Sequence, residues 1–152
     1  MTPGNPAVLS GTWFVVQTSL PLWRTRQNPS VTYAPLPDGR VVDTVRFTQR
    51  GRPGLIVGLD RPLPGGGWEW RGISLLTRFT PSRWQVAHAA DSWAITVFAR
   101  TPFTPAGLDV YARTPSLTAA QQTEVEAVLT TLPIAQPYLR DLFFPVHDEQ
   151  KS

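Results

Sequence analysis

The sequence of 152 residues contains no cysteine. Structural disulfides, a catalytic thiol and thiolate metal ligands are therefore excluded. Lysine is nearly absent as well: Lys151 is the only one, so the formal net charge of +3 comes almost entirely from arginine. No apolar stretch approaches the ~20 residues that a membrane-spanning helix needs. These absences favour a soluble chain that folds without covalent cross-links.

The first ten residues have neither the basic start nor the apolar run of a signal peptide. We therefore expect a cytoplasmic protein from the sequence as written, or a periplasmic or secreted one if a leader has been removed. Nothing resembles a helix-turn-helix, a zinc finger or an RNA-binding aromatic motif, so nucleic acid is not an expected partner. The clustered arginines have two interpretations, a basic rim that attracts anionic headgroups or a codon preference expressed on a solvated surface. They are Arg24, Arg26, Arg40, Arg46, Arg50 and Arg52.

What the chain does contain is a series of short apolar runs separated by turn signals, with 41% apolar and 16% charged residues. This pattern predicts an all-β sandwich or barrel rather than a disordered chain. The Asp38-Gly39 dipeptide is a strong hairpin signal between two of the runs. The length favours one domain over 1–152, with a barrel at about 9–115 and a tail at 133–152. The eight expected strands are 12–18, 29–36, 40–48, 54–60, 67–76, 83–89, 92–100 and 107–113.

The period of the pattern changes after the eighth strand. Thr118 and Gln121 have capping-box spacing, and apolar residues then recur on one helical face until Pro133. This predicts one amphipathic helix at about 118–132, packed on the outside of the barrel. The segment 138–144 that follows is expected to add a short strand or to wrap the barrel.

Four stretches follow one another along the chain: Gly11-Thr12-Trp13, then 28–33 with the Pro37-Asp38-Gly39 hairpin, then 91–97, and last 111–117, which contains Arg113. In this order they resemble the lipocalin family, and bacterial lipocalins most closely. The resemblance covers about residues 9–132. The chain departs from the family's pattern at Trp93, where a tyrosine is usual, and it lacks the lipoprotein cysteine of many bacterial members.

The resemblance implies an all-β fold, an eight-stranded antiparallel up-and-down calyx barrel with one C-terminal helix outside it. Gly11, Trp13 and Arg113 would form the barrel floor, with the guanidinium stacked across the indole. The implied function is the binding and transport or storage of a small hydrophobic molecule such as a fatty acid, a lysophospholipid or a similar lipid. No cofactor and no metal are implied.

Eight strands leave an interior that either fills with side chains or holds one ligand, and both outcomes stay open at this point. Strand alternation, anchored on an inward Trp13, predicts which residues face that interior. Gly72 and Ile95 belong to the predicted inward set. The predicted ligand-binding residues are Val15, Val31, Tyr33, Val41, Asp43, Val45, Leu55, Val57, Trp68, Trp70, Trp84, Val86, His88, Val97 and Ala99.

Polar groups inside such a cavity would supply specificity. Asp43 and His88 lie on strands that face each other, so together they are candidates to anchor a ligand hydroxyl, amine or headgroup. A local bulge that turns Asp43 outward is the alternative, and Asp109 is a further candidate at the open rim. Leu20, Leu22 and Trp23 in the first loop would form a lid or portal. The same loop, beside Arg24, is also a candidate for peripheral contact with an anionic membrane or for a partner-binding patch.

Catalysis is not the expected function, because no nucleophile elbow, phosphate-binding loop or metal-binding histidine pair is present. Two alternatives stay open. An isomerase-like enzyme could use Asp43 with Asp109 for acid–base chemistry on a bound lipophilic ligand. A haem-binding, nitrobindin-like barrel would need His88 inside it, since His147 lies in the polar tail and is expected to be solvated.

Overall fold

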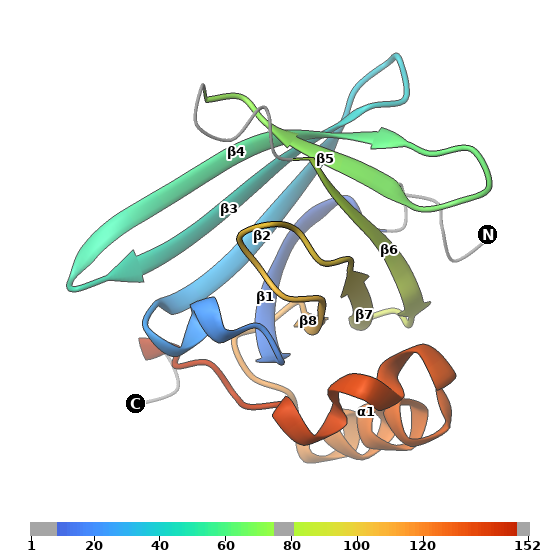
Figure 1. The fold of residues 1–152 in the computed structure, drawn as a ribbon. Helices are drawn as coiled ribbons and strands as arrows, with labels where there is room; N and C mark the ends of the chain where they lie inside the picture. Colours follow the sequence, from blue (N-terminus) through green and yellow to red (C-terminus); the bar gives the residue numbers. More distant parts are fainter. Residues whose placement is uncertain (1–8, 75–80, 149–152) are drawn as a thin grey trace.

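The computed structural model describes residues 9–74 and 81–148 of the chain. Eight antiparallel strands close into a barrel in which each strand pairs with the next and the first pairs with the last (Figure 1). One α-helix, α1 (Ala119–Thr131), lies outside the barrel. This architecture confirms the predicted fold class. The strands are β1 (Gly11–Thr18), β2 (Gln27–Pro35), β3 (Val41–Gln49), β4 (Arg52–Pro62), β5 (Trp68–Gly72), β6 (Ser82–Ala89), β7 (Trp93–Phe98) and β8 (Gly107–Ala112).

Each predicted strand overlaps an observed one, and the predicted hairpin at Asp38-Gly39 joins β2 to β3. The fifth strand was expected to run to residue 76, and its last two residues lie outside the described ranges. A second tight turn, at Arg50 and Gly51, connects β3 to β4. Both residues have positive φ, 53° and 76°, as a two-residue type I′ turn requires. This turn sets Gln49 opposite Arg52 and so determines the register of the longest hairpin.

The barrel has two apolar cores, because β7 and β8 are covered on both faces. An inner core around Trp13 and Tyr111 lies inside the barrel. A separate outer core joins the outward faces of β7 and β8 to α1. The principal members of this outer core are Trp93, Ile95, Val97, Leu108, Val110, Val125 and Leu129.

The helix begins as its sequence predicts. The Thr118 hydroxyl accepts from the Gln121 amide, and the Gln121 side chain accepts from the Thr118 amide, at 3.1 and 2.8 Å. The helix ends before Pro133, where a 3-10 segment, η3 (Pro133–Asp141), takes over. No helix within the described ranges is long and apolar enough to cross a membrane.

The C-terminal tail packs back against the barrel. Phe143 pairs with Thr18 through two backbone hydrogen bonds of 3.0 and 2.9 Å. His147 is only 2% exposed, and its Nε2 atom lies 2.7 Å from the carbonyl oxygen of Val15. The expectation of a solvated His147 was therefore wrong, because the tail returns to β1 instead of extending into solvent.

The base of the barrel is closed by Trp13 and Arg113. The guanidinium carbon of Arg113 lies 3.5 Å from the centroid of the buried indole. Its two terminal nitrogens donate to the carbonyl oxygens of Thr12 and Ser10, at 2.9 and 3.0 Å. Gly11 has φ of +94°, and a β-carbon there would lie 3.2 Å from the guanidinium. Glycine therefore both permits the turn into β1 and leaves room for the arginine.

Candidate ligand-binding site

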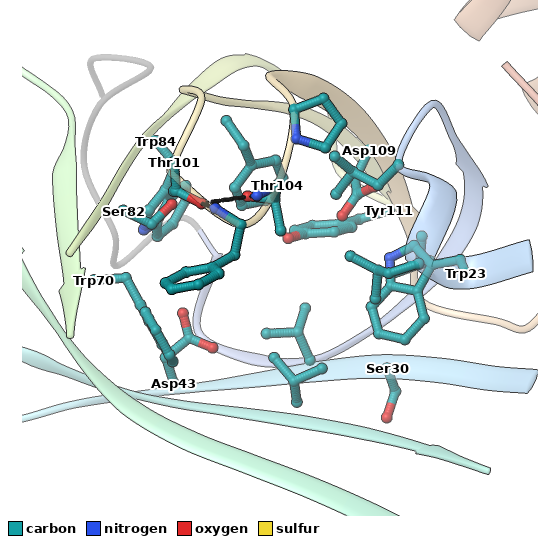
Figure 2. Close-up of a pocket in the computed structure, with 18 of the residues that line it drawn as sticks. Trp23, Ser30, Asp43, Trp70, Ser82, Trp84, Thr101, Thr104, Asp109 and Tyr111 are labelled. Carbon is teal, nitrogen blue, oxygen red and sulfur yellow. Dashed lines mark hydrogen bonds between the residues drawn. The ribbon is translucent and has the colours of Figure 1, made fainter. Parts of the chain in front are cut away.

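The barrel encloses a cavity of about 490 Å³ above its closed base. Its walls are mostly apolar and aromatic, and the loop between β7 and β8 contributes to it at the opposite end. Phe103 of that loop is 80% exposed and marks where the cavity meets solvent. Figure 2 shows the lining side chains converging from several strands and loops. They are Val15, Leu20, Leu22, Trp23, Ser30, Val31, Tyr33, Asp43, Val45, Trp70, Ser82, Trp84, Phe98, Thr101, Phe103, Thr104, Pro105, Asp109 and Tyr111.

The predicted ligand-binding residues fall into three groups. Three of them, Val41, Trp68 and Val86, belong to the inner core but do not line the cavity. Five are turned away from it: Leu55, Val57, His88, Val97 and Ala99. Those that do line the cavity are Val15, Val31, Tyr33, Asp43, Val45, Trp70 and Trp84.

The predicted orientation of β4 was wrong by one residue. Leu55 is 59% exposed, and the buried positions of this strand are Gly58 and Asp60. Val57 shares the outward side with Leu55. The reason is the two-residue turn after β3, which sets inward Asp43 opposite Gly58. The apolar run 54–60 does not by itself reveal this register, because both faces of the strand carry apolar or small residues.

The predicted orientation of β7 was also wrong by one residue. Ile95 and Val97 pack in the outer core under α1, and Ala99 follows the strand and is exposed. The inward residues are Ala94, Thr96 and Phe98. Because the helix covers the outer face, both faces of β7 are apolar, and alternation therefore carries no directional signal.

His88 lies on the outer side of the barrel rather than in the cavity. A β-bulge between Val86 and His88 reverses the side-chain direction after the inward Val86. The imidazole stacks on Trp93 with ring centroids 5.1 Å apart. The indole of Trp93 in turn donates to Glu124 of α1 at 3.0 Å. The predicted approach of His88 to Asp43 is therefore wrong.

The partner of Asp43 is another carboxyl, that of Asp60. The two share a hydrogen bond, and the Trp84 indole donates to Asp60 Oδ1 at 2.9 Å. Burial raises the pKa of Asp43 well above its ordinary value, and the neighbouring Asp60 charge raises it further. Burial also raises the pKa of Asp60, to about 6, against the lowering effect of its hydrogen bonds to Asp43 and Trp84. A hydrogen bond between two carboxyl groups requires a proton on one of them, and the raised pKa values of both favour this protonated form.

Two tyrosines and a third acid complete the polar lining. The hydroxyls of Tyr33 and Tyr111 lie 3.0 Å apart, and burial raises the pKa of both, so both stay protonated. Asp109 accepts from the Thr18 hydroxyl at 2.6 Å. Its pKa is raised by burial to about 7. Asp109 lies beside Tyr111, across the pocket from Asp43 and Trp70 (Figure 2).

The first loop forms part of the cavity wall. It contains the short 3-10 segment η2 (Pro21–Arg24). Leu20 and Trp23 are 7% and 6% exposed, and both line the cavity together with Leu22. Trp23 packs edge-on against Phe47 of β3, with centroids 5.9 Å apart. The three portal residues named from the sequence are thus brought together, and their role as a portal stays a prediction.

Sequence reasoning missed several residues of the site. Asp60 was missed because the predicted register of β4 was wrong by one residue. The two-residue turn at Arg50 and Gly51 is the signal that would have given the correct register. Phe98 was missed with the register of β7. Tyr111 lines the cavity two residues before Arg113, and the floor position of that arginine indicates the direction of its neighbours on β8.

Within 9–74 and 81–148, no three histidine or carboxylate side chains are grouped so that they could hold a metal ion.

No protein-family model and no curated protein matches the chain. Solved structures do match it. Lobster apocrustacyanin A1 has a TM-score of 0.70 at 12% identity, over 93% of this chain and 79% of that one.

Apocrustacyanin C2 has a TM-score of 0.72 at 12% identity, over 96% of this chain and 81% of that one. Apocrustacyanin C1 has a TM-score of 0.72 at 10% identity, over 94% of this chain and 79% of that one. At such low identity the likeness shows the fold alone. The chain therefore has the eight-stranded barrel with one C-terminal helix that is found in the crustacyanins, which are lipocalins.

Proposed function

We propose that this protein binds a small hydrophobic molecule in its barrel cavity and serves to transport or store it. The cavity of about 490 Å³ carries this proposal, because its size and its apolar, aromatic lining are those of a ligand pocket. A fully packed barrel would leave no such space. Valines and aromatic rings from β1, β2, β3, β5 and β6 surround it, and the loops at the mouth supply further apolar side chains.

The affinity available from such a site is moderate. Burying ~12 methylene groups at about 0.8 kcal/mol each contributes roughly 10 kcal/mol. Association costs at least ~4 kcal/mol, which leaves roughly 6 kcal/mol and a Kd of tens of micromolar. Apolar contact alone therefore supports binding of many lipophilic molecules, and selectivity requires the polar groups in the wall.

A lipid, such as a fatty acid or a lysophospholipid, is the ligand that the resemblance to bacterial lipocalins favours. The resemblance to bacterial members in particular rests on the sequence motifs. Native mass spectrometry of protein purified from its own host tests the ligand class, since a carried molecule is released and weighed. Recovery of a phospholipid fragment or an acyl chain supports a lipid, and a non-lipid molecule contradicts that choice.

Binding is favoured over the two alternatives by the positions of their key residues. An isomerase-like site built from Asp43 and Asp109 would need both carboxyls on one reacting group, and they lie on different sides of the cavity, with Asp43 bonded to Asp60. A haem site would need His88 in the cavity, and His88 stacks on Trp93 outside it.

Contact with an anionic membrane is a secondary proposal for the first loop. Arg24 and Arg26 stand beside the apolar residues at the mouth, and their guanidinium groups stack on Phe143 and Phe47 at 3.9 and 4.5 Å. Co-sedimentation with vesicles of neutral or anionic lipid tests it. Binding to anionic vesicles alone supports the proposal, and equal or absent binding contradicts it.

Titration with N-phenyl-1-naphthylamine, a neutral apolar fluorophore, tests the cavity function. We expect its emission to rise on binding and to be excited through the tryptophans that line the cavity, such as Trp70 and Trp84. The variant Val45→Phe projects a larger ring into the cavity and should weaken binding at least tenfold. Leu55→Phe, on the outward side of the adjacent strand, is the matched control and should bind as the parent does.

The two variants separate cavity binding from binding to the surface. Circular dichroism and urea unfolding first establish that both are folded. Absence of binding to the parent protein, or equal loss in Val45→Phe and Leu55→Phe, would contradict the proposed site.

A further inference from the structure

We propose that the cavity prefers a lipophilic ligand with a cationic head, an amine or a quaternary ammonium, held against Asp43 with its apolar tail directed toward the mouth. This inference rests on the proposed binding function and assigns the chemical class of the ligand. Asp43 lies near the start of β3, on the side of the closed base, and its carboxyl reaches the cavity (Figure 2). The head would therefore enter first and the tail would face the apolar loops.

The charge of the lining favours a cation. Of the described residues that line the cavity, the acidic ones are Asp43 and Asp109, and none is lysine, arginine or histidine. Asp60, on the neighbouring strand β4, shares a hydrogen bond with Asp43 and adds its negative charge there. A ligand carboxylate would meet like charge without a compensating cation, whereas an ammonium group would neutralise the carboxyl pair.

The carboxyl that lines the cavity at this place has no basic neighbour. Asp43 is 5% exposed, and the charged group that acts on it within the described part of the chain is Asp60, with which it shares a hydrogen bond. No lysine, arginine or histidine side chain is among the groups that act on it there. The N–H groups of an amine would donate to this carboxyl, and a quaternary ammonium would supply charge alone.

Aromatic faces surround this position. Tyr33 is the cross-strand neighbour of Asp43, and its ring stacks on Trp84 with centroids 5.4 Å apart. Trp84 stacks on Phe98 at 6.1 Å. Trp70 is the cross-strand neighbour of Asp60 and lines the same wall. Several ring faces around one carboxyl form the environment that attracts an organic cation most strongly.

Trp23 also lines the cavity, and its buried indole N–H has no hydrogen-bond partner within the described part of the chain. It belongs to the loop at the mouth and is neutral. It can donate to any oxygen of a ligand, but it cannot offset the charge of a carboxylate. The net charge of +3 attracts anions to the outside of the protein, which is opposite to the preference for cations proposed for the cavity. A preference for cations must therefore arise inside the cavity.

The test compares three ligands that share one tail. Dodecylammonium and dodecanoate, each below its micellar concentration, and 1-dodecanol, below its solubility limit, displace N-phenyl-1-naphthylamine from the parent protein at pH 7.5. We expect dodecylammonium to bind at least tenfold more tightly than dodecanoate, with dodecanol between them. Equal binding of all three, or tightest binding of dodecanoate, would overturn the inference while leaving the proposed cavity function intact. Failure of all three and of the fluorophore to bind would instead overturn the proposed function.

Variants locate the cationic head. Asp43→Asn keeps the size of the side chain and should reduce the ratio between dodecylammonium and dodecanoate affinities at least fivefold, with dodecanol unchanged. Asp91→Asn, at an exposed turn outside the cavity, controls for general loss of negative charge and should keep the parent ratio. An unchanged ratio of dodecylammonium to dodecanoate affinity in Asp43→Asn would overturn the placement of the cationic head at Asp43. A larger fall of this ratio in Asp109→Asn than in Asp43→Asn would overturn it as well. Retained binding of the fluorophore shows that each variant is folded.

Discussion

The substitution Asp109→Asn should make the protein more stable at alkaline pH, although it removes a buried and hydrogen-bonded carboxylate. Asp109 is 4% exposed, and the Thr18 hydroxyl donates to its Oδ1 at 2.6 Å. Asparagine keeps an acceptor at that position and carries no charge. Removal of the ionisation is therefore the main effect of this substitution.

The magnitude follows from the pKa of Asp109, which burial raises from 3.8 to about 7. Below pH 3.8 the carboxyl is protonated in both the folded and the unfolded chain, and it has no effect on the pH dependence. Between pH 3.8 and 7 the unfolded chain releases this proton while the folded protein retains it, so stability falls as the pH rises. Above pH 7 the full cost is present. At about 1.4 kcal/mol per pH unit, this cost is roughly 4 kcal/mol, of which roughly 3 kcal/mol develops between pH 5 and pH 8.

Urea unfolding of ligand-free protein, followed by tryptophan fluorescence at pH 5, 6, 7 and 8, measures the effect. The difference in unfolding free energy between Asp109→Asn and the parent should increase with pH by roughly 3 kcal/mol over this range. Contributions from Asp43 and Asp60 are common to both proteins and cancel. Asp91→Asn, at an exposed turn, should show no such increase. Parallel curves for Asp109→Asn and the parent would refute the argument that burial destabilises the ionised form.

Two further changes test the packing of the barrel and the start of the helix. Gly58→Ala would place a β-carbon against the Trp70 indole and the Arg71 backbone, and should destabilise the protein by about 1–3 kcal/mol in urea unfolding. Unchanged stability of Gly58→Ala would contradict this steric explanation. Thr118→Ala removes the hydroxyl that caps α1 and should cost about 1 kcal/mol, whereas Thr118→Ser should restore most of it. Equal stability of all three proteins would show that the capping box is not needed.

Local chemistry in the chain was enough to predict the elements of the fold. Asp38-Gly39 marks a hairpin and Thr118 with Gln121 marks a helix start, because each acts through atoms only a few residues apart. The closure of the barrel was predicted from the resemblance in order of four stretches, whereas the short apolar runs with regular turns left both a sandwich and a barrel open. These signals concern neighbours along the chain or across one turn.

The direction in which each strand faces was predictable where one side is polar, or where a motif residue sets it, as Trp13 does for Val15 on β1. On β2 and β3 the alternation is clear, and Tyr33 and Asp43 line the cavity as expected. On β7 the helix covers the outer side, so Ile95 and Val97 look like cavity residues in sequence although they pack beneath α1. A bulge in β6 turned His88 outward by the same kind of one-residue shift.

The carboxyl pair at the base of the cavity depended on tertiary structure. Asp43 and Asp60 meet because a two-residue turn sets the register of β3 and β4, and because barrel closure buries both. The sequence gives the identities of these two residues and of the aromatic residues around them. Their proximity and their raised pKa values arise only when distant strands exclude water from the space between them.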